Sequence, residues 1–147
     1  QGWNLKESHL QGLFQVYFYA SEDVAFTNSN NGVVVGNGIL HTSDGGVSWN
    51  IVEDATAMTG GKLKNVIFTN PSKGYATGQR YDFSYQYMEG MLYKTSNGGG
   101  SWTNFTISSE VNSENTDLRV VCSPSPDTLL AGSYSSFGTG STLFKST

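Results

Sequence analysis

Cysteine, proline and charge are all scarce in this sequence. The single cysteine, Cys122, cannot form a disulfide within the chain. Only 8 Lys and Arg residues stand against 12 Asp and Glu, and the net charge of −4 argues against nucleic acid or an anionic membrane surface as a partner. No apolar run approaches the roughly 18–20 residues that span a bilayer. Helical periodicity never extends beyond a turn or two, so no long helix is expected.

What the sequence has instead is glycine and aromatic residues. There are 18 glycines and only three prolines, and aromatic residues make up 13% of the chain. A chain of 147 residues is long enough to bury one core. This composition predicts an all-β fold with many tight turns.

One eight-residue stretch occurs twice. The first octapeptide is Thr42-Ser43-Asp44-Gly45-Gly46-Val47-Ser48-Trp49, and the second is Thr95-Ser96-Asn97-Gly98-Gly99-Gly100-Ser101-Trp102. The side-chain oxygen of Asp44 or Asn97 can accept hydrogen bonds from backbone N–H groups a few residues on, and the glycines supply positive φ angles. Each tryptophan is then expected to begin the next strand and to bury its ring against the hairpin. Partial copies stand at residues 2–5 and 143–147.

These octapeptides resemble the Asp-box (BNR) repeat, with Asn97 in place of the usual aspartate of the second copy. The resemblance implies β-propeller blades, in which the box joins the third and outermost strands, away from the ligand face. Propellers of this kind include sialidases and sortilin-type receptors. The box and its flanking strands together are most similar to photosystem II assembly-factor-like propellers. Residues 22–49 fit that pattern, 64–102 fit with a long insertion, and 118–147 fit partly.

The segments between the octapeptides also repeat. Short apolar strands are expected from Val24, Val66 and Val120, each followed by a polar turn and a second strand that ends in glycine. This predicts about three four-stranded antiparallel blades, roughly 4–49, 50–102 and 103–147, in a single partial propeller. The β-prone run at 13–20 has no counterpart, and it could be an extended inner strand, an added edge strand or the true first strand.

Three blades do not close a ring, since closed propellers have about 4–8. The chain is therefore expected to be part of a larger 6–8-bladed propeller. The alternative is a homo-oligomer in which two chains close a six-bladed ring by symmetry.

Candidate ligand-binding residues fall in two long loops opposite the octapeptides. In the loop at 79–90, aromatic residues occur at every second position and would line one side of an extended hairpin, with polar residues on the other. The loop at 133–141 could form the second wall of the same cleft. The alternatives are rings that pack on a neighbouring blade and a flexible surface loop. The candidates are Arg80, Tyr81, Asp82, Phe83, Tyr85, Tyr87, Tyr134 and Phe137.

The residues that could carry out catalysis do not favour an enzyme. Asp-box sialidases use three arginines, whereas this chain has only Arg80 and Arg119. Glycoside hydrolysis needs two facing carboxylates, and no motif pairs any here; Glu22, Asp23 and Asp117 are expected to be solvated. His9 and His41 are isolated, so neither a metal nor another cofactor is expected. Cys122 lies in an apolar run and is expected to be buried.

The function predicted from the sequence is a non-catalytic binding or scaffold propeller, secreted or at the cell surface (a bacterial periplasm or exterior), that presents its aromatic loops to a protein or a glycan. The alternative is a segment of a larger glycoside hydrolase or sialidase-like propeller with its catalytic residues elsewhere. A purely structural repeat in a filament or adhesin stalk is the third hypothesis.

Overall fold

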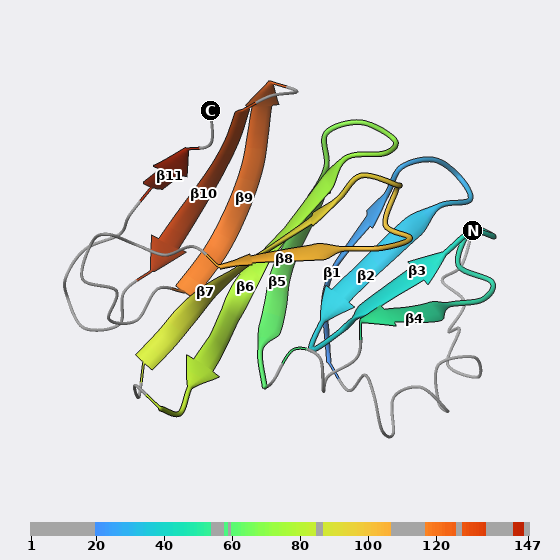
Figure 1. The fold of residues 1–147 in the computed structure, drawn as a ribbon. Helices are drawn as coiled ribbons and strands as arrows, with labels where there is room; N and C mark the ends of the chain where they lie inside the picture. The colour runs from blue at the N-terminus through green and yellow to red at the C-terminus, as the bar shows by residue number, and fades with distance from the viewer. Residues whose placement is uncertain are drawn as a thin grey trace, which may run out of the picture.

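The computed structural model of the chain describes residues 20–53, 58, 60–84, 87–106, 117–125, 128–134 and 143–145. These segments form three antiparallel sheets and contain no helix of the length and hydropathy needed to cross a bilayer (Figure 1). The all-β prediction is therefore confirmed. The predicted run at 13–20 lies outside the described residues except for Ala20, and so does the partial octapeptide at 2–5.

Each sheet follows the chain outward from an inner strand. The first sheet has the order β1 (Ser21–Phe26), β2 (Gly32–Gly36), β3 (Ile39–Thr42), β4 (Asn50–Glu53). The second has the order β5 (Lys62–Phe68), β6 (Gly74–Asp82), β7 (Tyr87–Thr95), β8 (Thr103–Thr106). Among the described residues the third contains three strands, β9 (Asp117–Ser125), β10 (Thr128–Tyr134) and β11 (Leu143–Lys145). The predicted blade boundaries after Trp49 and Trp102 fall within the sheets, because each octapeptide is a hairpin turn inside one sheet. Those boundaries would separate β4 and β8 from the sheets in which they pair.

The inner strands β1, β5 and β9 lie side by side, and the sheets fan out from them (Figure 1). Each octapeptide packs against the turn that joins the first two strands of its sheet. The N–H of Gly45 donates to the carbonyl of Asn30, and that of Gly98 donates to the carbonyl of Ser72, both at 2.8 Å. We call this end of the sheets the turn face. The opposite end, where β6 turns into β7, is the loop face.

The main core lies between the first two sheets. Val33, Val35 and Ile39 of the first sheet are fully buried. They form one cluster with residues of the second sheet, notably Ala76, Tyr93 and Trp102. Alternation along the strands explains this, because every second residue of a strand faces the same neighbouring sheet.

The first octapeptide forms its turn through local hydrogen bonds. Thr42 Oγ1 donates to Asp44 Oδ1 at 2.8 Å and accepts from the N–H of Gly46 at 2.9 Å, while Asp44 accepts from the N–H and the hydroxyl of Ser48. The second octapeptide repeats the bonds to Thr95 Oγ1 and Asn97 Oδ1, but here Asn97 Nδ2 donates to the hydroxyl of Ser101 at 2.9 Å. The expected positive φ angles are present at Gly45, Gly46, Gly98 and Gly99.

The octapeptide tryptophans contact the inner hairpins. The rings of Phe26 and Trp49 have centroids 6.3 Å apart, and those of Phe68 and Trp102 are 6.4 Å apart, both edge to face. Trp102 is buried and donates from Nε1 to the carbonyl of Gly99 at 3.1 Å. The tryptophans thus tie each octapeptide to the inner strand of its own sheet.

The third sheet differs from the prediction by one residue in register. Val121 pairs with Ala131, which in turn pairs with Phe144. In the second sheet Val66 pairs with Ala76, which in turn pairs with Tyr93. Val121 is therefore the counterpart of Val66. Because a shift of one residue exchanges the two faces of a strand, Val121 is buried whereas Val120 is 60% exposed. The predicted burial of Cys122 is wrong for the same reason, since the residue after Val121 faces away and is exposed.

Candidate functional site

The loop face carries an exposed pair of aromatic rings at the end of the β6–β7 hairpin. Tyr81 lies on β6, and Phe83 follows in the turn. Their ring centroids are 5.0 Å apart with an interplanar angle of 81°, and the two residues are 39% and 79% exposed. Two rings held edge to face in solvent offer apolar surface in a fixed arrangement, which suits contact with another molecule.

The hairpin is extended as predicted, but the aromatic row is not continuous. The ladder between β6 and β7 runs to the pairs Tyr81 with Met88 and Asp82 with Tyr87. Tyr87 is thus in register with Asp82 and not with Tyr81, and residues 83 and 84 lie in a turn after β6, so the every-second-residue alternation does not continue from β6 into β7. The expectation of a single aromatic side along a continuous strand is therefore wrong. Tyr85 lies outside the described residues.

Arg80 secures the base of this hairpin. Arg80 and Glu89 are paired across the two strands, and Arg80 Nε donates to Glu89 Oε2 at 2.6 Å. Both side chains are partly buried, with 32% and 14% of their surface exposed. Opposite charges on directly facing positions stabilise a strand pair, so Arg80 helps to hold the hairpin that presents Tyr81 and Phe83.

A second group of side chains comes from bulges at the loop-face end of the three inner strands. The ladder skips one residue at the same place in each strand. A bulge leaves one residue out of the pairing and redirects its side chain. In every case the skipped residue is charged: Glu22 in β1, Lys64 in β5 and Arg119 in β9. The three inner strands therefore carry a row of charges at their loop-face ends.

An ion pair between the first two sheets holds part of this row in place. Glu22 of β1 forms an ion pair with Lys62 of β5. The hydrogen bond from Lys62, helped by the charges of Lys62 and Lys64, lowers the pKa of Glu22 below its ordinary value despite the opposing effect of burial. Glu22 is thus held in its charged form, and its ion pair links the first sheet to the second.

Asp117 forms the corresponding link between the second and third sheets. It is buried, so the expectation that it is solvated is wrong. Arg119 Nε donates to Asp117 Oδ2 at 2.6 Å. The side-chain amide nitrogen of Gln79, on β6, donates hydrogen bonds to the two carboxylate oxygens of Asp117 at 2.7 and 2.8 Å. Because the buried carboxylate fixes one edge of the guanidinium, Arg119 keeps its position although its side chain is 53% exposed.

The remaining candidate residues are only partly placed. Tyr134 ends β10 opposite Asp117, at the loop face. The two predicted loops therefore begin on the same face of the molecule. Phe137 lies outside the described residues.

No family model matches this sequence, and no curated protein matches it either. Among the solved structures that match it in three dimensions, two have a TM-score of 0.54. One is "YCF48 bound to D1 peptide", at 16% sequence identity, and the other is "YCF48 from Cyanidioschyzon merolae", at 18%. YCF48, a photosystem II assembly factor, is a β-propeller.

The fold is that of a β-propeller. The resemblance to assembly-factor-like propellers is thereby confirmed at the level of the fold. The match covers 84% of this chain but only 39% of each YCF48 chain. This chain thus spans about two fifths of the propeller protein that it matches.

The row of bulge charges is the part of the site that the sequence analysis missed. With Val121 aligned to Val24 and Val66, a charged residue stands two positions earlier in every repeat, as Glu22, Lys64 and Arg119. The shift of one residue in the third repeat had hidden this periodicity. The contact of Gln79 with Asp117 has no signal of its own in the sequence, because it joins strands of different sheets.

Proposed function

We propose that this chain is a non-catalytic binding segment of a β-propeller that takes an extended segment of a partner protein on its loop face. The single observation that carries the proposal is the exposed edge-to-face pair of Tyr81 and Phe83 on the loop face, the face that also carries the charged row of Glu22, Lys64 and Arg119. Aromatic anchors with a polar, charged surround are typical of protein recognition sites.

Because the row contains both acidic and basic side chains, it favours a peptide over an apolar or uniformly charged ligand. A peptide offers backbone groups, apolar side chains and charges of either sign along one extended chain. A YCF48 structure that contains a D1 peptide supports the proposal by showing that a propeller of this fold can accommodate a peptide.

The test begins with the labelled chain on an array of peptides that vary in sequence and charge, followed by fluorescence polarisation with the best peptide. We expect saturable binding that falls about tenfold or more in the double variant Tyr81→Ala/Phe83→Ala, because the variant removes both anchors. Phe105→Ala is the matched control, because Phe105 is also an exposed aromatic residue but lies on the outer strand β8. It should leave the affinity within about twofold.

A glycan array probed in parallel separates the two ligand classes. Binding to glycans alone would overturn the proposal of a protein partner, since aromatic rings also stack on sugars. Peptide binding that is equally strong in the double variant would move the site away from the β6–β7 hairpin.

A further inference from the structure

The outer face of the first sheet, the face turned away from the second sheet, repeats a face that the second sheet buries in the main core. The two ladders have the same register, because Phe26 and Phe68 each pair with a glycine. Two positions earlier, Val24 is therefore the counterpart of Val66. Each phenylalanine also lies edge to face with the tryptophan of its own octapeptide. The first two sheets thus offer the same apolar surface on the same side.

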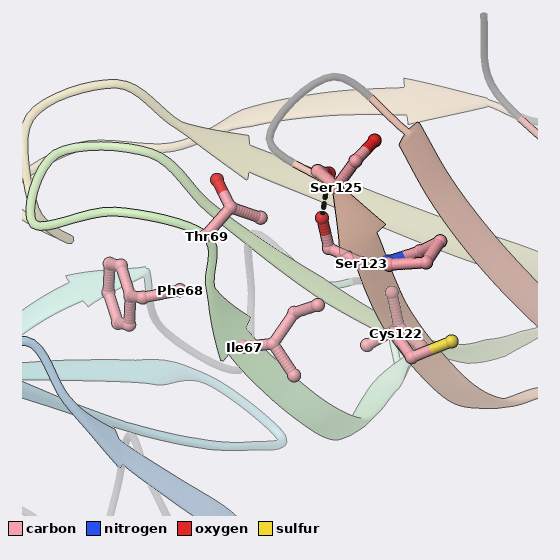
Figure 2. A pocket seen from close by; sticks show the side chains of 8 residues that line it. Ile67, Phe68, Thr69, Cys122, Ser123 and Ser125 are labelled. Atoms are coloured by element: carbon pink, nitrogen blue, oxygen red, sulfur yellow. Dashed lines mark hydrogen bonds between the residues drawn. The ribbon is translucent and has the colours of Figure 1, made fainter.

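The two surfaces differ in whether another sheet covers them. Figure 2 shows the two sides of β5, where Phe68 leaves the strand toward the first sheet and Ile67 leaves it toward β9. On the Phe68 side, Val66 is buried by the first sheet, whereas its counterpart Val24 is 54% exposed. Phe26 is exposed as well. An apolar surface that one sheet buries is thus left open on the other, which marks it as a contact site.

The surface that covers Val66 is the opposite face of the first sheet. Val33 and Ile39 of this face are fully buried in the same cluster. The face also fits closely against the second octapeptide, since a Cβ on Gly99 would collide with Val33 Cγ2. His41 lies beside the same glycine, with its Cδ2 3.4 Å from that Cβ position. Branched apolar side chains with a histidine next to the octapeptide therefore make up the covering surface.

The outer face of the third sheet, the face turned away from the second sheet, carries the counterpart of this covering surface. Since Val121 is the counterpart of Val66, the ladders place Leu130, Leu143 and Lys145 where the first sheet has Val33, Ile39 and His41. Leu143 is 69% exposed, although Ile39 at the same position is fully buried. The chain therefore carries both halves of one kind of sheet contact, and both halves are exposed.

The charges at the two outer faces are complementary. In the contact between the first two sheets, His41 lies beside the octapeptide that contains the uncharged Asn97. The same packing of a third sheet on a first sheet would bring Lys145 beside the octapeptide of Asp44. Hydrogen bonds from Ser48 and Thr42 lower the pKa of Asp44 to about 2, so this carboxylate is charged at neutral pH. A lysine would thus meet an aspartate, and such complementarity favours this pairing over others.

We propose that the outer face of the first sheet docks on the outer face of the third sheet of a second copy of this chain, in the manner that already joins the first two sheets. The occupant is a second copy because the chain itself supplies both complementary surfaces. The contact is heterologous, so it either closes a ring or continues into a longer assembly. It uses neither Tyr81 nor Phe83, and it is therefore independent of the proposed peptide site.

The test measures the molar mass of the whole chain by light scattering at concentrations from about 1 to 200 µM. We expect the mass to rise from that of one chain to that of two or more. Val24→Glu and Leu143→Glu each place a charge in one half of the contact and should weaken the association about tenfold or more. Phe105→Glu is the matched control, because Phe105 is an exposed aromatic residue of the second sheet, and it should change the association by less than about twofold.

An equimolar mixture of the two variants tests the head-to-tail arrangement. Each variant keeps one intact outer face, so the third sheet of the Val24→Glu chain can dock on the first sheet of the Leu143→Glu chain. The mixture should therefore form a heterodimer at concentrations where each variant alone is a monomer. Both substitutions are at exposed positions, so Tm should stay close to that of the unmodified chain.

Three results would overturn the proposal. The first is an unmodified chain that stays monomeric at about 200 µM, which would leave the two faces to a different partner or to further sheets. The second is association that neither variant weakens, which would place the contact elsewhere on the molecule. The third is a mixture that associates no more than the separate variants, which would mean that like faces meet. The first measurement needs no variant, so the proposal can fail even if a variant does not fold.

Discussion

Ser48 is bound to Asp44 through both its backbone and its side chain. Its N–H lies 2.9 Å from Asp44 Oδ1, and its hydroxyl lies 2.5 Å from Oδ2. The hydroxyl of Ser48 is the largest contributor, ahead of its N–H and the hydroxyl of Thr42, and together they lower the pKa of Asp44 from 3.8 to about 2. The charged form of Asp44 is therefore the form that stabilises the first octapeptide.

This pKa predicts an acid-sensitive turn. The folded-state pKa lies below the unfolded value, so the contribution of Asp44 is present above about pH 4 and is lost as the pH falls toward 2. Asp44→Asn, which copies the arrangement of Asn97, should lower Tm near neutral pH and make Tm less dependent on pH within this window. Thermal unfolding at several pH values measures both effects. Asn97→Asp is the converse variant and should increase the dependence of Tm on acid pH. If the unmodified chain and both variants gave parallel profiles of Tm against pH, the charged form of Asp44 would not be what stabilises the turn.

Gly99 is predicted to be the octapeptide glycine that is hardest to replace. It has φ of +99°, and a Cβ at this position would collide with Val33 Cγ2 of the first sheet. Gly99→Ala should therefore lower the free energy of unfolding by about 2–4 kcal/mol, combining backbone strain with overpacking. Gly60 has φ of +76°, and no atom lies within 4 Å of the position that a Cβ would take, so Gly60→Ala should cost only about 1–2 kcal/mol. Urea unfolding of the two variants gives the comparison, and equal losses would mean that the contact with Val33 is unimportant.

The register of the third sheet can be tested with two adjacent valines. Val121→Ala should lower the free energy of unfolding by about 1–3 kcal/mol, because Val121 is buried against the second sheet. Val120→Ala should change it by less than about 0.5 kcal/mol, because Val120 is largely exposed. The exposed thiol of Cys122 should also react with a thiol reagent without denaturant. The reverse order of the two valines would restore the register expected from the sequence.

The contact between Gln79 and Asp117 should couple the second and third sheets. A double-mutant cycle of Gln79→Ala and Asp117→Ala is expected to give an interaction free energy of about 1–2 kcal/mol, because the amide donates to a buried carboxylate. Urea unfolding of the four chains measures it. A matched cycle of Gln79→Ala with the exposed Asp44→Ala should give additive losses, and additivity in both cycles would show that the two sheets are not joined through this contact.

The fold class and the octapeptide turns could be read from the sequence because their chemistry is local. Thr42, Asp44 and Ser48 bond to one another within one turn, so their spacing alone specifies the structure. The same holds for the extended hairpin at 79–90, because the alternation that predicts it lies within one segment of the chain. The sequence also located Tyr81 and Phe83 in this hairpin, although the turn after β6 interrupts the regular alternation that drew attention to them.

The sequence by itself thus determined which segments are strands and how each octapeptide turns, since these depend on neighbours within a few residues. Only the tertiary structure decided the rest. In the run Val120-Val121-Cys122 every residue is apolar, so the run is compatible with either register, and the choice is made by the bulge at Arg119 and by packing on the second sheet. The burial of Asp117 and the position of Arg119 beside it follow from that choice. They depend on which residues of different sheets meet, and the local pattern of one strand does not contain that information.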